Sequence, residues 1–328
     1  MSAVNGVGLS LDEASYGEDL TIQKWFPATD FKHTMNNSLK ATPNIGSHGQ
    51  KHTQMGLFEV TGSFNMLCFP EYMPYLLYSL LGGLSTTGPA DSLYTHICTP
   101  DGAPKSLTLA VTRDNNAANI QETFPGAVIT EMKFSFKPGE PIMVAVTFFA
   151  QKAVIDTRGA PSFSTDPPLI MLTSDDYYKY GGSADTYISA AEVTIKREYP
   201  SLDAESVIGS RFRKSATSGL ITMEGTMDRI FKEDSALNEF LGSATAVEPA
   251  EDPNTHTLDI RSKSNTLVGT TSVYQMNWVA DEILFDTRDS GVDRQSLEVE
   301  NLKWFAQDDG TSDFISVNCK NGRATYTN

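Results

Sequence analysis

A 30-residue segment of this chain occurs twice without gaps, and this feature limits the possible folds more than any other. Residues 38–67 (SLKATPNIGSHGQKHTQMGLFEVTGSFNML) align with residues 201–230 (SLDAESVIGSRFRKSATSGLITMEGTMDRI) at an offset of 163, with ten identities. Average composition would give about two identities by chance. We therefore expect two halves with the same fold. The copied segment combines a long loop with one strand, which favours a protein that packs copies of one unit together.

The charge and the cysteines exclude several functional classes. The net charge is −16, from 25 basic and 41 acidic residues, which disfavours proteins that grip nucleic-acid phosphates or anionic lipid. Cys68, Cys98 and Cys319 form no CxxC pair, so we expect neither a zinc ribbon nor a disulfide framework. The chain has no signal-like N-terminus and no apolar run of the ~20 residues that cross a bilayer. These features predict a soluble protein made in a cytoplasm, with no membrane partner.

Apolar and polar residues alternate with a period of two through most of the chain. In residues 57–66 one face is apolar and the other polar, and the copy at 221–228 keeps the same phase. Two hairpins follow the same rule, one at residues 128–148 around a Lys-Pro-Gly-Glu turn and one at residues 274–300. The pattern predicts antiparallel strand pairs with one dry and one wet face.

The predicted fold class is therefore mainly β. We expect two tandem, similar antiparallel β-sandwich or half-barrel domains at residues 1–155 and 188–328, each with one flanking α-helix. The helices are predicted at residues 70–81 and 234–241, with a proline in the first turn of one and a glycine after the end of each. Residues 156–187 are rich in Pro, Ser, Asp and Gly and are interpreted as a linker or as a surface loop of the first domain.

A search for catalytic or metal-binding motifs gives no support for an enzyme. His48 and His52 are four residues apart, but they lie in a loop rather than on a predicted helix, so a metal pair is disfavoured. The other histidines, His33, His96 and His256, are interpreted as surface residues of strands or loops. The sequence contains no Walker A, GxSxG or HExxH motif. We therefore expect no catalytic residues, no metal and no cofactor.

Two long loops, residues 38–55 and 201–218, are locally basic in an acidic chain. Loops of this length are uncommon in compact domains, and the same length occurs twice. One interpretation is an ordinary solvated loop, and the other is a docking arm that contacts an acidic surface of a neighbouring copy. The residues concerned are Lys40, His48, Lys51, His52, Arg211, Arg213 and Lys214.

The order of these elements resembles the major tail tube protein of bacteriophages with long non-contractile tails. The resemblance depends on GLFEVTGSFNML and the helix after it, on the hairpin GAVITEMKFSFKPGEPIMVAVTFFAQ, and on their second-half equivalents. It covers roughly residues 20–155 and 188–325. No single motif is specific, and the tubes of contractile tails and secretion devices share the fold.

This resemblance implies a structural protein of the virion, assembled in the host cytoplasm. Domains of this family join side by side into rings, and the rings stack into a tube through which the genome is ejected. A duplicated version is similar to those that build a pseudo-hexameric ring from three chains. The implied partners are other copies of the chain, the tape measure protein, and the tail terminator and tip proteins. DNA would pass through the lumen without specific binding.

The polar faces of the predicted strands are then expected to line the lumen. Their net acidic character would repel DNA phosphates. The residues are Glu59, Thr61, Ser63, Glu131, Lys133, Thr222, Glu224, Asp228, Glu298 and Glu300. Two other classes stay open: another ring-forming tail component, such as a distal tail or adaptor protein, and a tandem β-sandwich that binds carbohydrate or a cell surface through a flat patch of exposed aromatic rings. Trp25, Trp278 and Trp304 lie in strand-like segments, and most are expected in the core.

Overall fold

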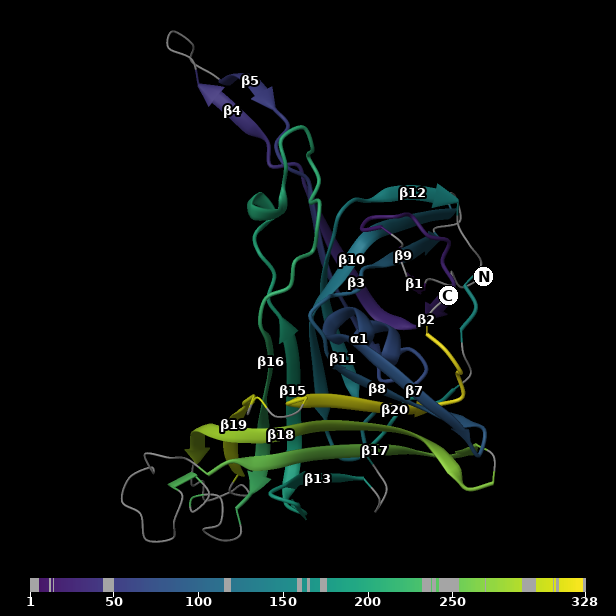
Figure 1. Ribbon diagram of the computed structural model, residues 1–328, viewed down its shortest axis with the longest axis vertical. Coiled ribbons are helices and arrows are strands. Elements are labelled where there is room, and N and C mark those ends of the chain that lie inside the picture. The colour runs from purple at the N-terminus through teal and green to yellow at the C-terminus, as the bar shows by residue number, and fades with distance from the viewer. Residues whose placement is uncertain are drawn as a thin grey trace.

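The protein is mainly β, as the sequence predicts, and the ladders between its named strands are antiparallel in this computed structural model (Figure 1). The structure describes residues 6–11, 13, 15–43, 50–114, 119–157, 161–163, 166–171, 176–231, 237, 240–241, 254–268, 270–290, 299–308, 310 and 313–326. Within these ranges, the side chains at 42–43, 50–52, 114, 119 and 157 are not described. None of the helices in the described part of the chain is both long and apolar enough to cross a bilayer.

The first half of the chain contains twelve named strands and one helix. The strands are β1 (Val7–Leu11), β2 (Lys24–Phe26), β3 (Ala28–Asn36), β4 (Lys40–Pro43), β5 (Gln50–Gln54), β6 (Glu59–Leu67), β7 (Gly82–Ala90), β8 (Leu93–Pro100), β9 (Leu107–Asp114), β10 (Asn119–Phe136), β11 (Met143–Ala150) and β12 (Val154–Thr157). Helix α1 spans Met73–Leu81. It begins three residues later than predicted because Pro74 occupies its first turn, where a missing N–H is tolerated.

The second half repeats the plan with fewer named elements. They are β13 (Tyr177–Tyr180), β14 (Ser183–Ala184), β15 (Ile188–Arg197), the 3₁₀ turn η1 (Leu202–Glu205), β16 (Ile221–Ile230), β17 (His256–Val268), β18 (Ser272–Ser290), β19 (Val299–Ala306) and β20 (Ile315–Asn321). The helix predicted at 234–241 lies largely outside the described residues. The predicted linker, residues 156–187, contains β13, which pairs with β17 of the second half.

One long sheet runs through both halves. Its strand order is β3-β6-β11-β10-β15-β16-β19-β18, so the two halves meet at the β10–β15 pair. Each half contributes four strands in the same order, with β15, β16, β19 and β18 taking the places of β3, β6, β11 and β10. The two halves are therefore fused edge to edge through backbone hydrogen bonds rather than joined by a linker alone.

A second layer covers one face of the long sheet. One part of it is β2-β1-β9-β10-β12, from the first half. The other part is β7-β8-β20-β18-β17-β13, in which the first-half hairpin β7–β8 joins strands of the second half. Strands β10 and β18 are long enough to belong to both layers. Figure 1 shows β17, β18 and β20 crossing β15 and β16, with α1 between β11 and the β7–β8 hairpin. Helix α1 is almost entirely buried between these layers.

Local irregularities recur at matching positions of the two halves. The β10–β11 ladder has a bulge between Ile129 and Glu131, and the β18–β19 ladder has one between Phe285 and Thr287. On β3, the bulged Thr29 donates its hydroxyl to the Asn65 carbonyl at 3.1 Å. On β15, Ser189 donates to the Asp228 carbonyl at 3.1 Å. These matches define which residues of the two halves are structurally equivalent.

One of the three glycine positions shared by the two copied segments, Gly62 and Gly225, is required by the packing of the neighbouring strand. Gly62 on β6 is paired with Phe148 on β11, and Gly225 on β16 is paired with Trp304 on β19. In both places the aromatic ring of the neighbouring strand lies where a Cβ would be. Glycine is required because only a residue without a side chain leaves room for the ring.

Arg197, at the end of β15, ties the second half to the helix of the first. Its guanidinium donates to the carbonyls of Leu80 at 3.0 Å, Leu81 at 3.1 Å and Asp101 at 2.6 Å, and the residue is 2% exposed. The Leu80 and Leu81 carbonyls belong to the C-terminal end of α1, where backbone acceptors have no partner within the helix, and the Asp101 carbonyl follows the end of β8. Arg197 therefore caps a helix that lies more than 100 residues earlier in the chain.

We expect Arg197→Met to lower the free energy of unfolding by about 2–3 kcal/mol, because buried carbonyls lose their donors. Urea denaturation measures the change. Lys196→Met is the matched control, since Lys196 is exposed on the opposite face of the same strand, and we expect a change within ~0.5 kcal/mol. Equal midpoints for the two variants would show that the cap does not stabilise the fold.

The β7–β8 hairpin holds the two halves together at a second place. β8 pairs with β20, and Asp91 at the hairpin tip accepts hydrogen bonds from the backbone of Thr270, Thr271 and Ser272 at 2.7–3.1 Å. These bonds from the β17–β18 turn hold the pKa of the Asp91 carboxyl well below its usual range. A carboxylate at the tip therefore fastens a first-half hairpin to a second-half turn.

His96 on β8 is fully buried, so its interpretation as a surface residue is wrong. Its ring nitrogens contact the Thr86 hydroxyl at 2.9 Å and the Asn321 side-chain oxygen at 3.2 Å. Burial lowers the pKa of His96 below its ordinary value of 6.5. The folded state therefore favours the neutral ring, and the unfolded state binds the proton first as the pH falls.

Stability should consequently decrease as the pH falls below about 6.5, the ordinary His pKa. His96→Gln should remove part of this decrease because glutamine does not titrate. The test compares urea midpoints at neutral pH and near pH 5 for the parent protein and the variant. An unchanged pH slope in the variant would exclude His96 as a source of the acid sensitivity.

Candidate assembly surfaces

The long sheet has one face covered by the second layer and one face that is not, here called the open face. The backbone register places eight of the predicted lumen residues together on the open face, where all are exposed or half-exposed. They are Glu59, Thr61, Ser63, Glu131, Lys133, Thr222, Glu224 and Asp228. Their neighbours along each strand, such as Val60, Met132 and Met223, are buried on the covered face.

The open face crosses the boundary between the two halves without interruption. Glu131 on β10 is paired with Lys196 on β15, which is paired with Thr222 on β16. At the same boundary the Lys133 ammonium lies 2.7 Å from the Glu192 carboxylate, with both side chains about 40% exposed. Because both groups are solvated, this ion pair contributes more to the specificity of the pairing than to stability.

Further charged residues share the open face but were missed by the sequence reasoning. They include Asp30, Lys32, Glu192, Lys196, Asp289 and Lys303. The alternation of Glu192, Thr194 and Lys196 along β15 is a signal that could have identified part of this set. Acidic groups exceed basic ones on the described open face, but the charges are interspersed. A hollow of about 320 Å³ between Lys133, Glu224 and Lys303 contains both signs.

Glu300 is a correction to the sequence prediction. It is 2% exposed and forms an ion pair with Arg288. Its cross-strand partner on β16 is Arg229, which is itself buried and lies 2.7 Å from the Asp185 carboxylate. Glu300 therefore lies on the covered face, where the Arg288 guanidinium of the neighbouring strand β18 compensates its charge. The exposed residue is Val299, which the sequence phase had placed on the dry side.

Four predicted site residues cannot be placed. His48 and Glu298 lie outside the described residues, and the side chains of Lys51 and His52 are not described.

The first loop, residues 38–55, contains a projecting hairpin, which the sequence did not predict. β4 and β5 pair only with each other among the described strands and form a separate two-stranded sheet. Figure 1 shows this hairpin extending away from both layers. Lys40, Leu39 and Met55 near its base are exposed. We call residues 38–55 the first arm.

The second loop, residues 201–218, has a different conformation and packs against the first half. Arg211 donates to the Gly56 carbonyl at 2.9 Å and to the Asn37 side chain at 3.0 Å, at the base of the first arm. The backbone N–H of Phe58 donates to the Arg211 carbonyl at 2.8 Å. The second loop thus reaches over the ends of the first-half strands.

Arg213 is a correction to the sequence prediction: it was expected to present a charge for docking, but it is buried. Its guanidinium pairs with Glu205 and lies 4.1 Å from the centre of the Phe149 ring. This ion pair stabilises the second loop itself. Lys214 is exposed, and its backbone N–H donates to the Glu205 carbonyl at 3.0 Å. Of the three predicted docking residues on this loop, Lys214 is exposed, Arg211 is partly exposed and Arg213 is buried.

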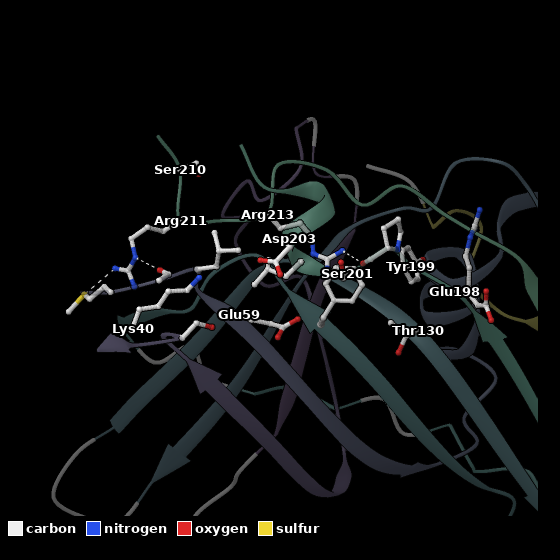
Figure 2. A pocket seen from close by; sticks show the side chains of 18 of the residues that line it. Lys40, Glu59, Thr130, Glu198, Tyr199, Ser201, Asp203, Ser210, Arg211 and Arg213 are labelled. Atoms are coloured by element: carbon white, nitrogen blue, oxygen red, sulfur yellow. Dashed lines mark hydrogen bonds between the residues drawn. The ribbon is translucent and has the colours of Figure 1, made fainter. Parts of the chain in front are cut away.

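A groove of about 1090 Å³ lies between the first arm and the second loop. Figure 2 shows Lys40 and Arg211 on one side of it, with Glu59 at the end of the open face nearby. The groove therefore joins the open face to the two loops. Its mixed lining of Lys, Arg and Glu is suited to a peptide surface of mixed charge.

Exposed apolar side chains at the loop tips are a contact signal that the sequence reasoning missed. Ile208 is fully exposed, and Val207 and Phe212 are 51% and 39% exposed. Ile208 belongs to the Ile-Gly-Ser triplet that both copied segments share, so the repeated triplet was the available signal. Apolar residues gathered at a loop tip are typical of surfaces that contact another molecule.

Neither a metal-binding group nor a reactive thiol is found among the described residues. They include no group of three or more His, Cys, Asp or Glu side chains suited to hold a metal ion. The three cysteines are buried, and burial raises the pKa of the Cys98 thiol to about 12. A thiol that remains protonated at neutral pH is a poor nucleophile and a poor ligand.

The comparison with known proteins agrees with the geometry of the long sheet. A family model described as phage tail tube protein matches residues 5–293, which is most of the chain. No curated protein matches the sequence. The matched range includes β1 to β18, whereas β19 of the long sheet and β20 of the second layer lie beyond it. The chain belongs to the phage tail tube protein family.

Proposed function

We propose that this protein is the repeating subunit of a phage tail tube in which three chains close into a pseudo-six-fold ring. The observation that carries the proposal is the β10–β15 pair, which joins two similar four-stranded units edge to edge in one sheet. A sheet that already joins two units has an edge at each end suited to the next unit. Closing the ring would remove those edges.

In this tube the open face lines the channel and the rings stack through the loops. The exposed polar residues of β6, β10 and β16 support this orientation, because a channel that carries DNA must present a wet wall. The excess of acidic groups would repel phosphates weakly. The first arm would reach the next ring, with the exposed side chains of the second loop supplying further contacts.

The same proposal places this protein in the tail of the virion, with copies of itself, the tape measure protein and the terminator and tip proteins as partners. The boundary between the two units would fall between β12, which pairs with β10, and β13, which pairs with β17. We expect a structural role without catalysis, in keeping with the tail tube family.

The experiment that tests the proposal is cryo-electron microscopy of tubes grown from concentrated purified protein, with native mass spectrometry of the rings. We expect rings of three chains. Rings of six chains, or a protein that stays monomeric at every concentration, would contradict the proposal. A closed single ring that never stacks would instead favour a distal tail or adaptor component.

The carbohydrate-binding alternative receives less support. It requires flat aromatic rings on an exposed surface, whereas Trp25, Trp278 and Trp304 are 7%, 0% and 2% exposed. The expectation that most of the tryptophans lie in the core is confirmed.

The channel assignment makes a prediction about DNA movement. Changing Glu59, Glu131 and Glu224 together to Lys should leave tubes intact and slow DNA ejection, because a basic wall attracts phosphates. The matched control changes the same residues to Gln, which removes charge without creating attraction. The rate of DNA release from virions that carry each variant measures the effect. Equal release rates for the Lys and Gln variants would place these residues outside the DNA path.

A further inference from the structure

The pair that joins the two halves provides a template for contacts between chains. Across β10–β15, Glu131 is opposite Lys196, Lys133 is opposite Thr194, and Ser135 is opposite Glu192. The Lys133 ammonium reaches diagonally to the Glu192 carboxylate at 2.7 Å. The pairing thus has a defined register and a base on β10 that matches an acid on β15.

Each half has strands equivalent to both sides of this pair. Counting from the matching bulges and glycine–aromatic pairs, Lys133 on β10 is equivalent to Asp289 on β18. By the same count Glu192 on β15 is equivalent to Lys32 on β3. Relative to the β10–β15 pair, the positions of the two charges are therefore exchanged. The acid lies on β18, the equivalent of β10, and the base lies on β3, the equivalent of β15.

The equivalent strands lie at the two ends of the long sheet. Among the described strands, β3 pairs only with β6, and residues 284–290 of β18 pair only with β19. Lys32 is exposed, with its nearest acidic group being Asp30 of the same strand at 3.9 Å, and Asp289 is exposed as well. Two sheet edges of complementary charge are thus presented at opposite ends of one molecule.

From this complementarity we infer that β18 of one copy pairs with β3 of the next copy in the register of the β10–β15 pair. Thr287 then lies opposite the neighbour's Asn36, Asp289 opposite its Thr34, and the Asp289 carboxylate reaches its Lys32 diagonally. The occupant of both edges is a second copy of this chain. This inference rests on the proposed tube function and specifies the contact that closes the ring.

The chain topology leaves one free edge from each half. Strands β10 and β15 are already paired with each other, so β3 of the first half and β18 of the second half are the free edges of the described long sheet. Pairing β18 with β3 of the next copy therefore makes first and second halves alternate around the ring.

Charge reversal tests the ion pair. At low salt, Lys32→Glu and Asp289→Lys should each raise the concentration at which half of the protein is in rings by roughly fivefold or more, the effect of reversing one exposed pair. Combining the two substitutions should restore most of the parent behaviour. Lys196→Glu is the matched control, because it makes the same charge change on the open face of β15, in the middle of the long sheet and away from both edges. If the double variant instead shows the sum of the two single losses of ring formation, the inferred Asp289–Lys32 ion pair is wrong.

A cysteine cross-link tests the register independently. Asn36→Cys combined with Thr287→Cys keeps the ion pair and places two thiols opposite each other, so oxidation should give covalent oligomers that end at three chains. Met35→Cys with Thr287→Cys shifts one thiol to the other face and should not cross-link. Tubes without cross-links or charge rescue would refute the register while leaving the tube function standing. A parent protein that never assembles would refute both.

Discussion

Replacing residues 40–54 by a short Gly/Ser link is expected to abolish tube growth while the shortened protein stays folded. The β4–β5 hairpin pairs only with itself among the described strands, so its removal takes no hydrogen bond from either layer. The chain ends at its base already lie close together, since the Gly56 N–H donates to the Asn37 carbonyl at 3.1 Å. A short link therefore closes the gap without strain. Negative-stain microscopy measures tube growth, and urea denaturation measures the fold.

Two comparisons make this result specific. A hairpin of the same length built from alternating Thr and Ser around an Asn-Gly turn restores the reach of the first arm without its side chains. If this control still fails to grow tubes, the side chains carry the contact; if it grows tubes, the length is sufficient. Normal tubes from the shortened protein would show that the first arm is not a docking element. The second loop is unsuitable for the same deletion, because its Arg213–Glu205 pair is buried against Phe149.

Gly225→Ala is expected to lower the free energy of unfolding by about 3 kcal/mol, the upper part of the range for overpacking in a core. An added Cβ would meet the Glu192 carbonyl oxygen of the neighbouring strand and the Trp304 ring. The carbonyl belongs to the β15–β16 ladder and cannot move without breaking it. Gly62→Ala should act in the same direction, since its Cβ would lie 2.6 Å from the Phe148 ring and 2.7 Å from the Lys32 carbonyl.

The control for these substitutions is Ser63→Ala, on the open face of β6 beside Gly62. It removes one exposed hydroxyl, and we expect a change within ~0.5 kcal/mol. Urea midpoints of the three variants decide the question. If both glycine variants have the same urea midpoint as Ser63→Ala, the Phe148 and Trp304 rings can move aside to accommodate an added methyl group. Loss of stability at Gly225 alone would mean that the Phe148 ring yields and the Trp304 indole does not.

The period-two alternation was sufficient to predict the strands and most of their faces. Met132, Phe134 and Val146 are buried, and Lys133 and Glu131 are on the open face, as their positions in the pattern require. The helix at Met73–Leu81 was also predictable from its proline and glycine signals. These features are local, because the direction of a side chain in a strand depends only on its place in the sequence.

Glu300 was assigned to the wrong face of the sheet, which shows the limit of predictions from local alternation. Leu302 and Trp304 share the face of Glu300, so continuing the alternation backward from them would have placed this carboxylate inside. A buried acid is disfavoured unless it has partners. Here the partners come from other strands, with Arg288 on β18 forming the ion pair and Arg229 on β16 lying opposite. No pattern within β19 contains that information.

The sequence by itself showed that a 30-residue segment occurs twice, and its period-two alternation predicted antiparallel strands with a dry and a wet face. Only the tertiary structure decided how the two loops differ. Arg213 and Glu205 hold the second loop against the first half, whereas the aligned residues of the first arm are Gln50 and Thr42, which cannot form an ion pair. The tertiary structure also decided that β10 joins β15 and that β3 and β18 end the long sheet. Strand neighbours depend on contacts between residues far apart in the chain, and a repeated local pattern is compatible with several such arrangements.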